Sequence, residues 1–235
     1  MEIITKGFDF FDIEKNLQIA VEDGKVIRII SYAMSSDVEN TLDKIVERIL
    51  EKHGRMDLKS LVYTCTKELA INATKANLKR IFFEEYGLDI NNEKEYNEGM
   101  ALYKKIMKED MSINYGKKAK KQGLYVRISF FYNNSVLKIE VINNLGITAE
   151  EEVRLREKLA KTMQYNDLMQ YYMDNADDTE GEGMGIALII ILLKGENIDP
   201  NLFRIYSENS RTIARIEIPM ARDYKTIRNE RKKSV

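Results

Sequence analysis

Three glycines at alternate positions, Gly181, Gly183 and Gly185, lead directly into the apolar run 186–193. Glycine has no side chain to keep a ligand away from the backbone, so its N–H group stays accessible. A helix that begins at such a segment also directs the positive end of its dipole toward it. The pattern therefore predicts a loop-to-helix junction that binds an anion, most often a phosphate. Glycine-rich segments also form plain flexible turns, and that alternative stays open.

Segment 61–76 predicts a helix, because it contains neither glycine nor proline. At helical periodicity Glu68, Asn72 and Lys75 fall on one face, beside apolar residues that are expected to pack. These polar groups need partners, because burying them unpaired is costly. A carboxylate and an amide oxygen can hold a hydrated Mg²⁺, and an amine can balance phosphate charge. The alternative is a Glu68–Lys75 pair on a solvated helix face.

Two motifs and their order resemble the GHKL superfamily, the ATP-binding domain shared by gyrase, mismatch-repair ATPases and sensor histidine kinases. The first is Glu68-x-x-x-Asn72-Ala, the N-box of that family, and the second is the later Gly181-x-Gly183-x-Gly185-Ile-Ala. Segment 202–219 also looks like the two closing strands of that domain. The resemblance implies a Bergerat-type α/β fold, a two-layer α+β sandwich in which helices cover one face of a mixed β-sheet.

The part that precedes the N-box is similar in layout to the stand-alone anti-sigma serine kinases. Segment 26–32 predicts a strand, and Ser36-Asp-Val-Glu39 is a capping box that opens a helix through Glu51. Asp57 can cap the N-box helix that follows. The only histidine, His53, is expected to be a surface residue at a helix end rather than a phosphoacceptor.

The central motif of this chain departs from the family pattern. A hairpin is expected from segments 124–132 and 135–141, after which the family has Asp-x-Gly-x-Gly. Here the sequence is Asn143-Asn144-Leu145-Gly146-Ile147. With one residue deleted, the resemblance places Asn143 at the aspartate that accepts a hydrogen bond from adenine, and Gly146 at the second glycine. The uncharged amide would weaken that bond by about 1–2 kcal/mol. Asn143-Asn144 as a strand-end turn is the alternative.

The resemblance implies a role for each residue that matches the family's motifs. Asn72 would ligate a Mg²⁺ that bridges the phosphates of ATP, and Lys75 would help to neutralise them. Glu68 would orient or deprotonate the attacking hydroxyl, which a protein serine or threonine supplies in a kinase and water supplies in an ATPase. Backbone N–H groups for the phosphates would come from Gly181, Gly183 and Gly185.

The expected function is accordingly that of an ATP-binding regulatory protein, a serine/threonine kinase that uses Mg-ATP. Its protein partner would be a sigma factor or an antagonist-like protein, and a homodimer is compatible with the resemblance. One alternative is a degenerate GHKL-fold module that binds a partner with weak or no nucleotide turnover. Another is an orphan histidine-kinase-like ATPase domain.

Composition narrows the remaining classes of function and location. The 235 residues are 44% apolar, and 37 Lys and Arg against 38 Asp and Glu give a formal net charge of −1. Nothing in that balance indicates nucleic acid as a partner. Cys65 is the only cysteine, which excludes an internal disulfide, and its helical position predicts a core residue. No leader is recognised and run 186–193 is too short to span a bilayer, so we expect a cytoplasmic protein without a membrane segment.

The expected organisation is one ATP-binding domain over residues 25–220 with additions at both ends and within. Residues 1–24 are expected to hold short strands, with a hairpin turn at 22–25 that joins strand 17–21 to strand 26–31. A basic tail is expected at 221–235.

Two internal segments are expected to be additions or moving parts. The insertion at 88–123 predicts a helix over 93–108 and then a basic loop at 116–123, most simply a solvated one. The segment 146–180 would form a lid over the nucleotide, with helices at 149–162 and 165–173 and an acidic hinge at 174–180.

Overall fold

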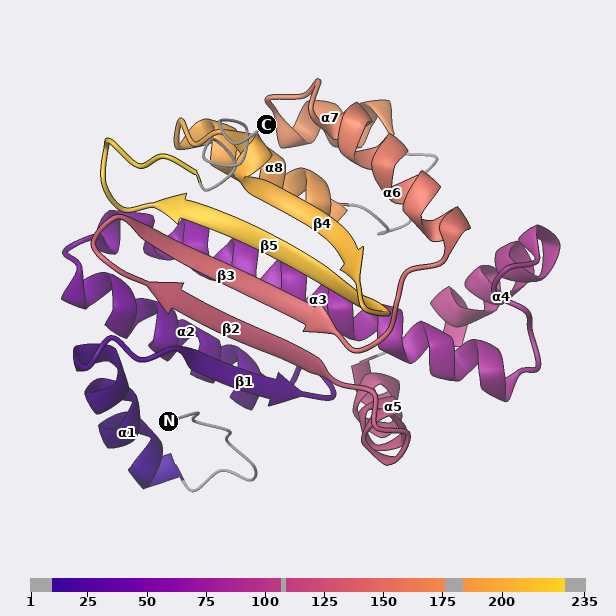
Figure 1. Cartoon of the computed structure of the whole chain (residues 1–235). Helices are drawn as coiled ribbons and strands as arrows, with labels where there is room; N and C mark the ends of the chain where they lie inside the picture. The colour runs from indigo at the N-terminus through magenta and orange to yellow at the C-terminus, as the bar shows by residue number, and fades with distance from the viewer. Residues whose placement is uncertain (1–9, 107–108, 176–183, 227–235) are drawn as a thin grey trace.

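A computed structural model describes residues 10–106, 109–175 and 184–226, with side chains described for 14–106, 114–175 and 184–226. A five-stranded sheet forms one layer, and helices form the other layer behind it (Figure 1). The strands are β1 (Ile27–Ser31), β2 (Val126–Tyr132), β3 (Val136–Asn143), β4 (Phe203–Glu208) and β5 (Arg211–Pro219). The α-helices are α1 (Phe10–Glu22), α2 (Ser36–Lys52), α3 (Lys59–Glu85), α4 (Glu93–Ile106), α5 (Glu109–Lys121), α6 (Ala149–Thr162), α7 (Leu168–Asp174) and α8 (Met184–Gly195).

The predicted two-layer sandwich is confirmed, but its sheet is antiparallel throughout the described strands and not mixed. The strand order is β1-β2-β3-β5-β4, and each neighbouring pair is antiparallel. A mixed sheet would require a parallel neighbour, and the long connection through α6, α7 and α8 leads instead to β4 and β5, which run antiparallel to their neighbours. The Bergerat-type fold stays a prediction.

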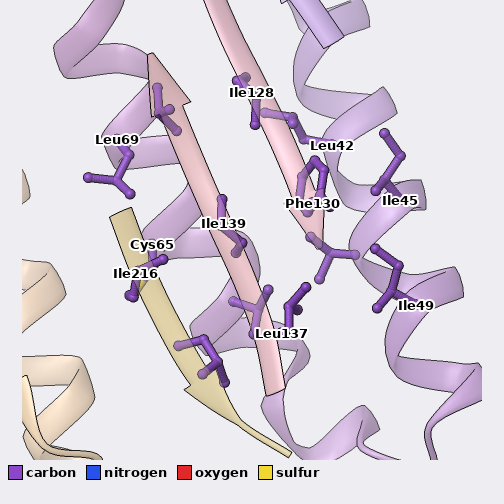
Figure 2. Packing of buried hydrophobic residues seen from close by; sticks show 14 of the residues in the cluster. Leu42, Ile45, Ile49, Cys65, Leu69, Ile128, Phe130, Leu137, Ile139 and Ile216 are labelled. Atoms are coloured by element: carbon purple, nitrogen blue, oxygen red, sulfur yellow. The ribbon is translucent and has the colours of Figure 1, made fainter. Parts of the chain in front are cut away.

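The main hydrophobic core lies between the sheet and helices α2 and α3. Figure 2 shows Phe130 of β2 and Ile139 of β3 facing Leu42 of α2 and Leu69 of α3. Alternate strand residues point to this face because successive side chains of a strand project to opposite sides. Full burial of one such side chain contributes about 1.5–3 kcal/mol. The core thereby fixes the position of α3 against the sheet.

Two of the expected helix starts differ in detail. Helix α2 is capped by Ser35, whose side chain accepts a hydrogen bond from Val38 N, so the cap precedes the predicted box at Ser36 by one residue. Asp57 does not cap α3, because it lies in the 3₁₀ turn η1 (Met56–Leu58) and pairs with Arg55 at 3.0 Å. The helix predicted over 61–76 is confirmed as α3, which extends well beyond those bounds.

The prediction of a strand at 17–21 and a hairpin turn after it is wrong, because residues 10–22 form helix α1. The part of the N-terminal prediction that concerns residues 1–9 lies outside the described residues. Leu17, Ala20 and Val21 are all buried, and their spacing places them on one helical face. The turn after them is a helix end rather than a hairpin. Gly24 has a φ of +66°, and Lys25 N donates to the carbonyl of Ala20 at 2.9 Å, which is the geometry of a glycine C-cap.

The insertion is helical over both of its parts, so the predicted basic loop at 116–123 is wrong for most of its length. Helix α4 agrees with the expectation for 93–108 as far as Ile106, and residues 107–108 lie outside the described residues. In α5, Tyr115 and Ala119 are buried one turn apart in a second core on the C-terminal half of α3. Burial of the apolar side of α5 therefore favours a helix in spite of the lysines on its other side. One of these lysines, Lys118, pairs with Glu85 at 2.5 Å.

The remaining expectations for the hairpin, the two closing strands and the helix at 149–162 are confirmed by β2–β3, β4–β5 and α6. The helix predicted at 165–173 is also present, as α7 at Leu168–Asp174, whereas the role of this segment as a lid stays a prediction. Of the acidic segment 174–180 and the basic tail 221–235, residues 176–180 and 227–235 lie outside the described residues. Within the described parts of the chain, none of the helices combines the length and apolar character that crossing a bilayer requires.

His53 ends α2, where its Nδ1 lies 3.1 Å from the Asn134 Oδ1 at the β2–β3 turn. Burial lowers the pKa of His53 below its ordinary 6.5, the contact with Asn134 raises it in part, and the charge of Lys52 lowers it again. The folded protein therefore takes up this proton less readily than the unfolded chain, so stability is unaffected above pH 6.5 and falls as the pH drops below it.

Because His53 is the only histidine, its ring proton gives a single NMR titration curve. We expect a midpoint below 6.5, and a still lower midpoint in Asn134→Ala. A midpoint at or above 6.5 in the wild type would contradict the burial of this ring.

Candidate functional site

Helix α3 and the beginning of α8 bring together residues that lie far apart in the sequence. A Cβ atom placed on Gly185 would lie 2.5 Å from Glu68 Oε2 and 3.1 Å from Asn72 Nδ2. Separations under 3.0 Å are essentially never seen for real Cβ atoms. The Gly185 position thus leaves just enough room for the Glu68 and Asn72 side chains as they stand. Of the predicted site residues, these three are joined directly by the structure.

Helix α8 takes this position because it is apolar on the side that faces the domain. Ile186, Ile189, Ile190 and Leu193 are buried, at spacings of three, four and seven residues along the helix. Three of them are fully inaccessible to solvent. This packing sets α8 against α3, so the glycine in its first turn meets the polar residues of the N-box.

The other predicted phosphate ligands are placed less completely. Glu68 and Asn72 are half-buried, whereas Lys75, one turn further along α3, is exposed. Lys75 therefore lies on the same side of the helix and is not held in the Glu68–Asn72–Gly185 contact. Gly181 and Gly183 lie outside the described residues.

Asn143 occupies the end of β3 and is buried against the middle of α3. Its Nδ2 donates to the carbonyl of Ala73 at 2.9 Å and to Asn77 Oδ1 at 3.3 Å. In the part of the chain that the structure describes, no hydrogen bond is found to Asn143 Oδ1, so that oxygen is the acceptor left for a ligand. Sequence reasoning did not identify Asn77, because nothing local marks an asparagine as the partner of a strand end 66 residues away.

The turn that follows β3 is held by Asn144 rather than by Asn143. Asn144 Oδ1 accepts a hydrogen bond from Tyr125 N at 2.8 Å, and its Nδ2 donates to the carbonyl of Gly123 at 2.7 Å. The alternative prediction, that Asn143-Asn144 forms a turn at the end of the strand, therefore holds for Asn144. Asn143 is still a residue of the strand. The two asparagines have separate roles.

Gly146 is not part of the contact between α3 and α8. A Cβ there would lie 3.6 Å from the backbone of Ser210, which is an ordinary contact distance, so space does not demand glycine. Its carbonyl accepts a long hydrogen bond of 3.5 Å from Arg80 Nη2. Its predicted role at the nucleotide stays a prediction.

Glu151 ties the start of α6 to α3. Its carboxylate lies 2.7 Å from Lys79 Nζ and 2.5 Å from Arg80 Nη2, and it accepts a hydrogen bond from Thr148 N at 3.1 Å. Burial alone would raise the pKa of Glu151, but the charges of Lys79 and Arg80 and these hydrogen bonds outweigh it and lower the pKa. Thr148 and Glu151 form a capping box that the sequence does carry, three residues apart. The pairing with Arg80, 71 residues away, has no local signal.

Replacing Glu151 by alanine is expected to lower the free energy of unfolding by about 2–3 kcal/mol, because two largely buried cations lose their partner. Glu152→Ala is the matched control, because its largely exposed carboxylate pairs, within the described parts of the chain, with exposed Arg156, and its loss should cost less than about 1 kcal/mol. The difference between wild type and Glu151→Ala should be present above pH 4.5 and diminish as the pH falls below it. Urea denaturation at several pH values measures this, and equal losses in both variants would contradict it.

The other end of α6 is tied to α8. Lys194 Nζ donates to the carbonyls of Met163 at 2.7 Å and Tyr165 at 2.6 Å, and to Asn166 Oδ1 at 3.1 Å. A cation at the C-terminus of a helix is favourable, because the carbonyl groups there have no partners within the helix. Helix α6, the first part of the predicted lid, is thus fastened to both helices that form the site.

The donor set can be compared with the expected Mg²⁺. Among the described residues, no three or more His, Cys, Asp or Glu side chains gather in a way that could hold a metal ion. A Mg²⁺ bound with ATP needs few protein ligands, because it keeps several waters and takes oxygens from the phosphates. The oxygens of Asn72 and Glu68 beside the bare Cα of Gly185 fit such a mode of binding.

Cys65, one turn before Glu68, has no place in the chemistry. Its side chain is fully buried in the main core. Burial and, to a smaller extent, the charge of Glu68 raise the pKa of Cys65 to about 12. The thiol therefore stays protonated, and the prediction of a core residue is confirmed.

Comparison with known proteins yields one informative relative. Over 208 residues, which are 88% of this chain and 40% of the relative, the chain is 33% identical to an uncharacterized protein of Treponema pallidum (strain Nichols). The chain therefore spans about two fifths of the length of that relative. No family model matches the chain. No solved structure matches it either.

Proposed function

We propose that the chain binds Mg-ATP between α3 and α8 and acts as a regulatory serine/threonine protein kinase. The observation that carries this proposal is the contact of Gly185 with Glu68 and Asn72. The glycine motif and the N-box are weak signals separately. They meet where a Cβ on Gly185 would clash with Glu68 and lie tightly against Asn72. The resemblance to GHKL domains requires that meeting.

Each residue of the site would have a separate task. Bound Mg²⁺ would supply positive charge to the phosphates, with Asn72 as its protein ligand. The exposed amine of Lys75 would add charge at the solvent side, and the Oδ1 of Asn143 would accept a hydrogen bond from the adenine amino group. Glu68 would orient or deprotonate the hydroxyl of a protein serine or threonine. Phosphoryl transfer requires mainly such positioning and charge neutralisation.

A degenerate, partner-binding module is the second candidate, and the neutral Asn143 favours it. Its amide nitrogen is used within the fold, by Ala73 and Asn77, and its oxygen lacks the charge of the family's aspartate. In either case the partner would be a protein. If the chain acts as an anti-sigma kinase, that partner would be a sigma factor or an antagonist of one. A cytoplasmic location belongs to the same proposal. An orphan histidine-kinase-like ATPase would differ from the proposed kinase only in transferring the phosphate to water instead of to a protein hydroxyl.

Thermal denaturation with ATP, ADP and GTP, each with and without Mg²⁺, tests the proposal. A ligand at about a hundred times its Kd stabilises by about 2.7 kcal/mol. For a chain of this length that corresponds to a rise of roughly 5–10 °C in Tm. A rise that needs Mg²⁺ and is specific for adenine nucleotides supports nucleotide binding. No rise with any nucleotide at millimolar concentration would favour the partner-binding module.

Two substitutions separate binding from transfer. Asn72→Ala is expected to remove the Mg-dependent rise in Tm, because it removes the metal ligand. Glu68→Ala is expected to keep that rise and to lose phosphate transfer, measured as ATP turnover with radiolabelled γ-phosphate. Asn97→Ala, at an exposed position of α4, is the control and should behave as the wild type. Turnover retained in Glu68→Ala would contradict the role of the carboxylate.

A further inference from the structure

The face of the sheet that points away from α2 and α3 is not covered by any described helix, as Figure 1 shows from that side. Strand alternation and register identify its charged side chains, which we call the basic sheet face. They are the basic residues Arg28, Arg127, Lys138, Arg204, Arg211 and Arg215 and the acidic residues Glu140, Glu208 and Glu217. Six basic against three acidic residues contrast with the net charge of −1 of the whole chain.

Apolar side chains lie between these charges. They include Ile30 of β1, Phe131 of β2, Ile142 of β3, Tyr206 of β4 and Ile213 of β5, and all of them point to the same face as the arginines. Ile142 and Ile213 are buried, and neither belongs to the main core. Arginine and aromatic residues together with apolar ones are the composition of protein–protein interfaces.

The face already engages two carboxylates of its own. Glu140 lies 3.4 Å from Lys138 Nζ and 4.0 Å from Arg215 Nε. Glu217, with only 1% of its side chain exposed, lies 2.8 Å from Arg215 Nη2 and 3.6 Å from Arg204 Nη2, and it accepts a hydrogen bond from the hydroxyl of Tyr224. The Nε atoms of Arg127 and Arg204 are buried and have no hydrogen-bond partner among the described residues, and the side chains of both residues are half-buried. A guanidinium group carries five N–H donors, so a half-buried arginine can still bind a carboxylate from outside.

The choice between anionic partners follows from the aromatic and apolar residues. Single-stranded nucleic acids are bound by stacking bases on free aromatic faces. Lys138 Nζ lies 4.0 Å from the ring centroid of Phe131, so one face of that ring is already taken. The isoleucines between the arginines would find no apolar group to contact on a phosphate backbone. A second copy of this chain would be repelled, because its own basic sheet face carries the same charge. A protein segment offers both carboxylates and apolar side chains.

We propose that the basic sheet face docks an acidic partner protein, through a segment that carries glutamate or aspartate interspersed with apolar side chains. The nucleotide site is formed by α3 and α8, which lie behind the sheet, so this docking surface is separate from it (Figure 1). The proposal holds whether or not the chain binds ATP.

Fluorescence anisotropy with a short fluorescein-labelled peptide of alternating glutamate and leucine tests the proposal. We expect the wild type to bind it, with an affinity that falls as salt is added. In the double variant Arg127→Ala, Arg211→Ala binding should be at least about tenfold weaker, which corresponds to the loss of charged contacts. The control removes the same charge from exposed positions of α5, in Lys117→Ala, Lys121→Ala, and should bind as the wild type.

Several outcomes would overturn the proposal. One is the absence of peptide binding by the wild type, and another is equal weakening in the two double variants, which would show a general charge effect. Tighter binding of a labelled oligothymidylate than of the peptide would identify a nucleic-acid surface instead. Self-association that is lost in Arg127→Ala, Arg211→Ala, measured by analytical ultracentrifugation, would identify a second copy as the occupant. Unchanged Tm values of both double variants confirm that they are folded.

Discussion

Gly185→Ala is expected to abolish stabilisation by Mg-ATP while leaving the unliganded protein at least as stable as the wild type. The new Cβ would require Glu68 Oε2, the far end of a flexible side chain, to move away, which costs little. Alanine is also favoured over glycine in a helix by up to about 1 kcal/mol. The new methyl group also crowds Asn72, which can then no longer hold Mg²⁺ in the proposed site. The ligand therefore loses its stabilisation of about 2.7 kcal/mol at a hundred times the wild-type Kd.

Gly195→Ala is the matched control, because it lies in the same helix and nothing lies within 4 Å of the position of its Cβ. Thermal denaturation with and without Mg-ATP compares both variants with the wild type. If Gly185→Ala and Gly195→Ala show the same nucleotide-dependent rise in Tm, the contact with Glu68 and Asn72 is not part of a nucleotide site. If Gly185→Ala loses stability without any ligand, the glycine serves packing alone.

Phe82→Ala is expected to lower the free energy of unfolding by about 3–5 kcal/mol, the range for truncating a buried phenylalanine. Phe82, on the C-terminal half of α3, is fully buried in the second core. Its ring stacks on Tyr86 with 4.4 Å between centroids and meets Tyr103 of α4 edge-on at 5.3 Å. It also contacts Tyr115 of α5 at 6.4 Å, so one side chain joins both helices of the insertion to α3.

Tyr172→Ala provides the control, because Tyr172 on α7 is 50% exposed and should change stability by less than about 1 kcal/mol. Urea denaturation gives the loss of stability, and hydrogen exchange shows where it occurs. Amide protection should fall first in α4 and α5. Protection that falls equally over the main core, or a loss of stability no larger than that of Tyr172→Ala, would contradict the second core as the anchor of the insertion.

The parts of the fold that follow from local periodicity could be predicted from the sequence. The N-box helix, the β2–β3 hairpin and α6 each carry their own pattern of apolar residues or caps. Residues 17–21 and 116–123 could not be assigned in this way. In both, a few apolar residues such as Val21 and Ala119 decide the structure by packing against α2 or α3, and such contacts have no signature within the segment.

The candidate site shows the same division between local and distant signals. Glu68 and Asn72 could be predicted because they share a helical face, and Gly185 because its glycine pattern has a known use. The partners of Asn143 and Glu151 could not, since Asn77 and Arg80 lie 66 and 71 residues away in the chain. The tertiary fold alone brings those pairs together.

Isothermal titration of the wild-type protein with ATP, with and without Mg²⁺, tests the central claim most directly. The account predicts one ATP site per chain, with binding that requires Mg²⁺ and that Asn72→Ala removes. Binding of ATP that is unaffected by Mg²⁺ and by Asn72→Ala would contradict the proposed site. No measurable binding at millimolar ATP would contradict nucleotide binding altogether and leave the chain as a partner-binding module.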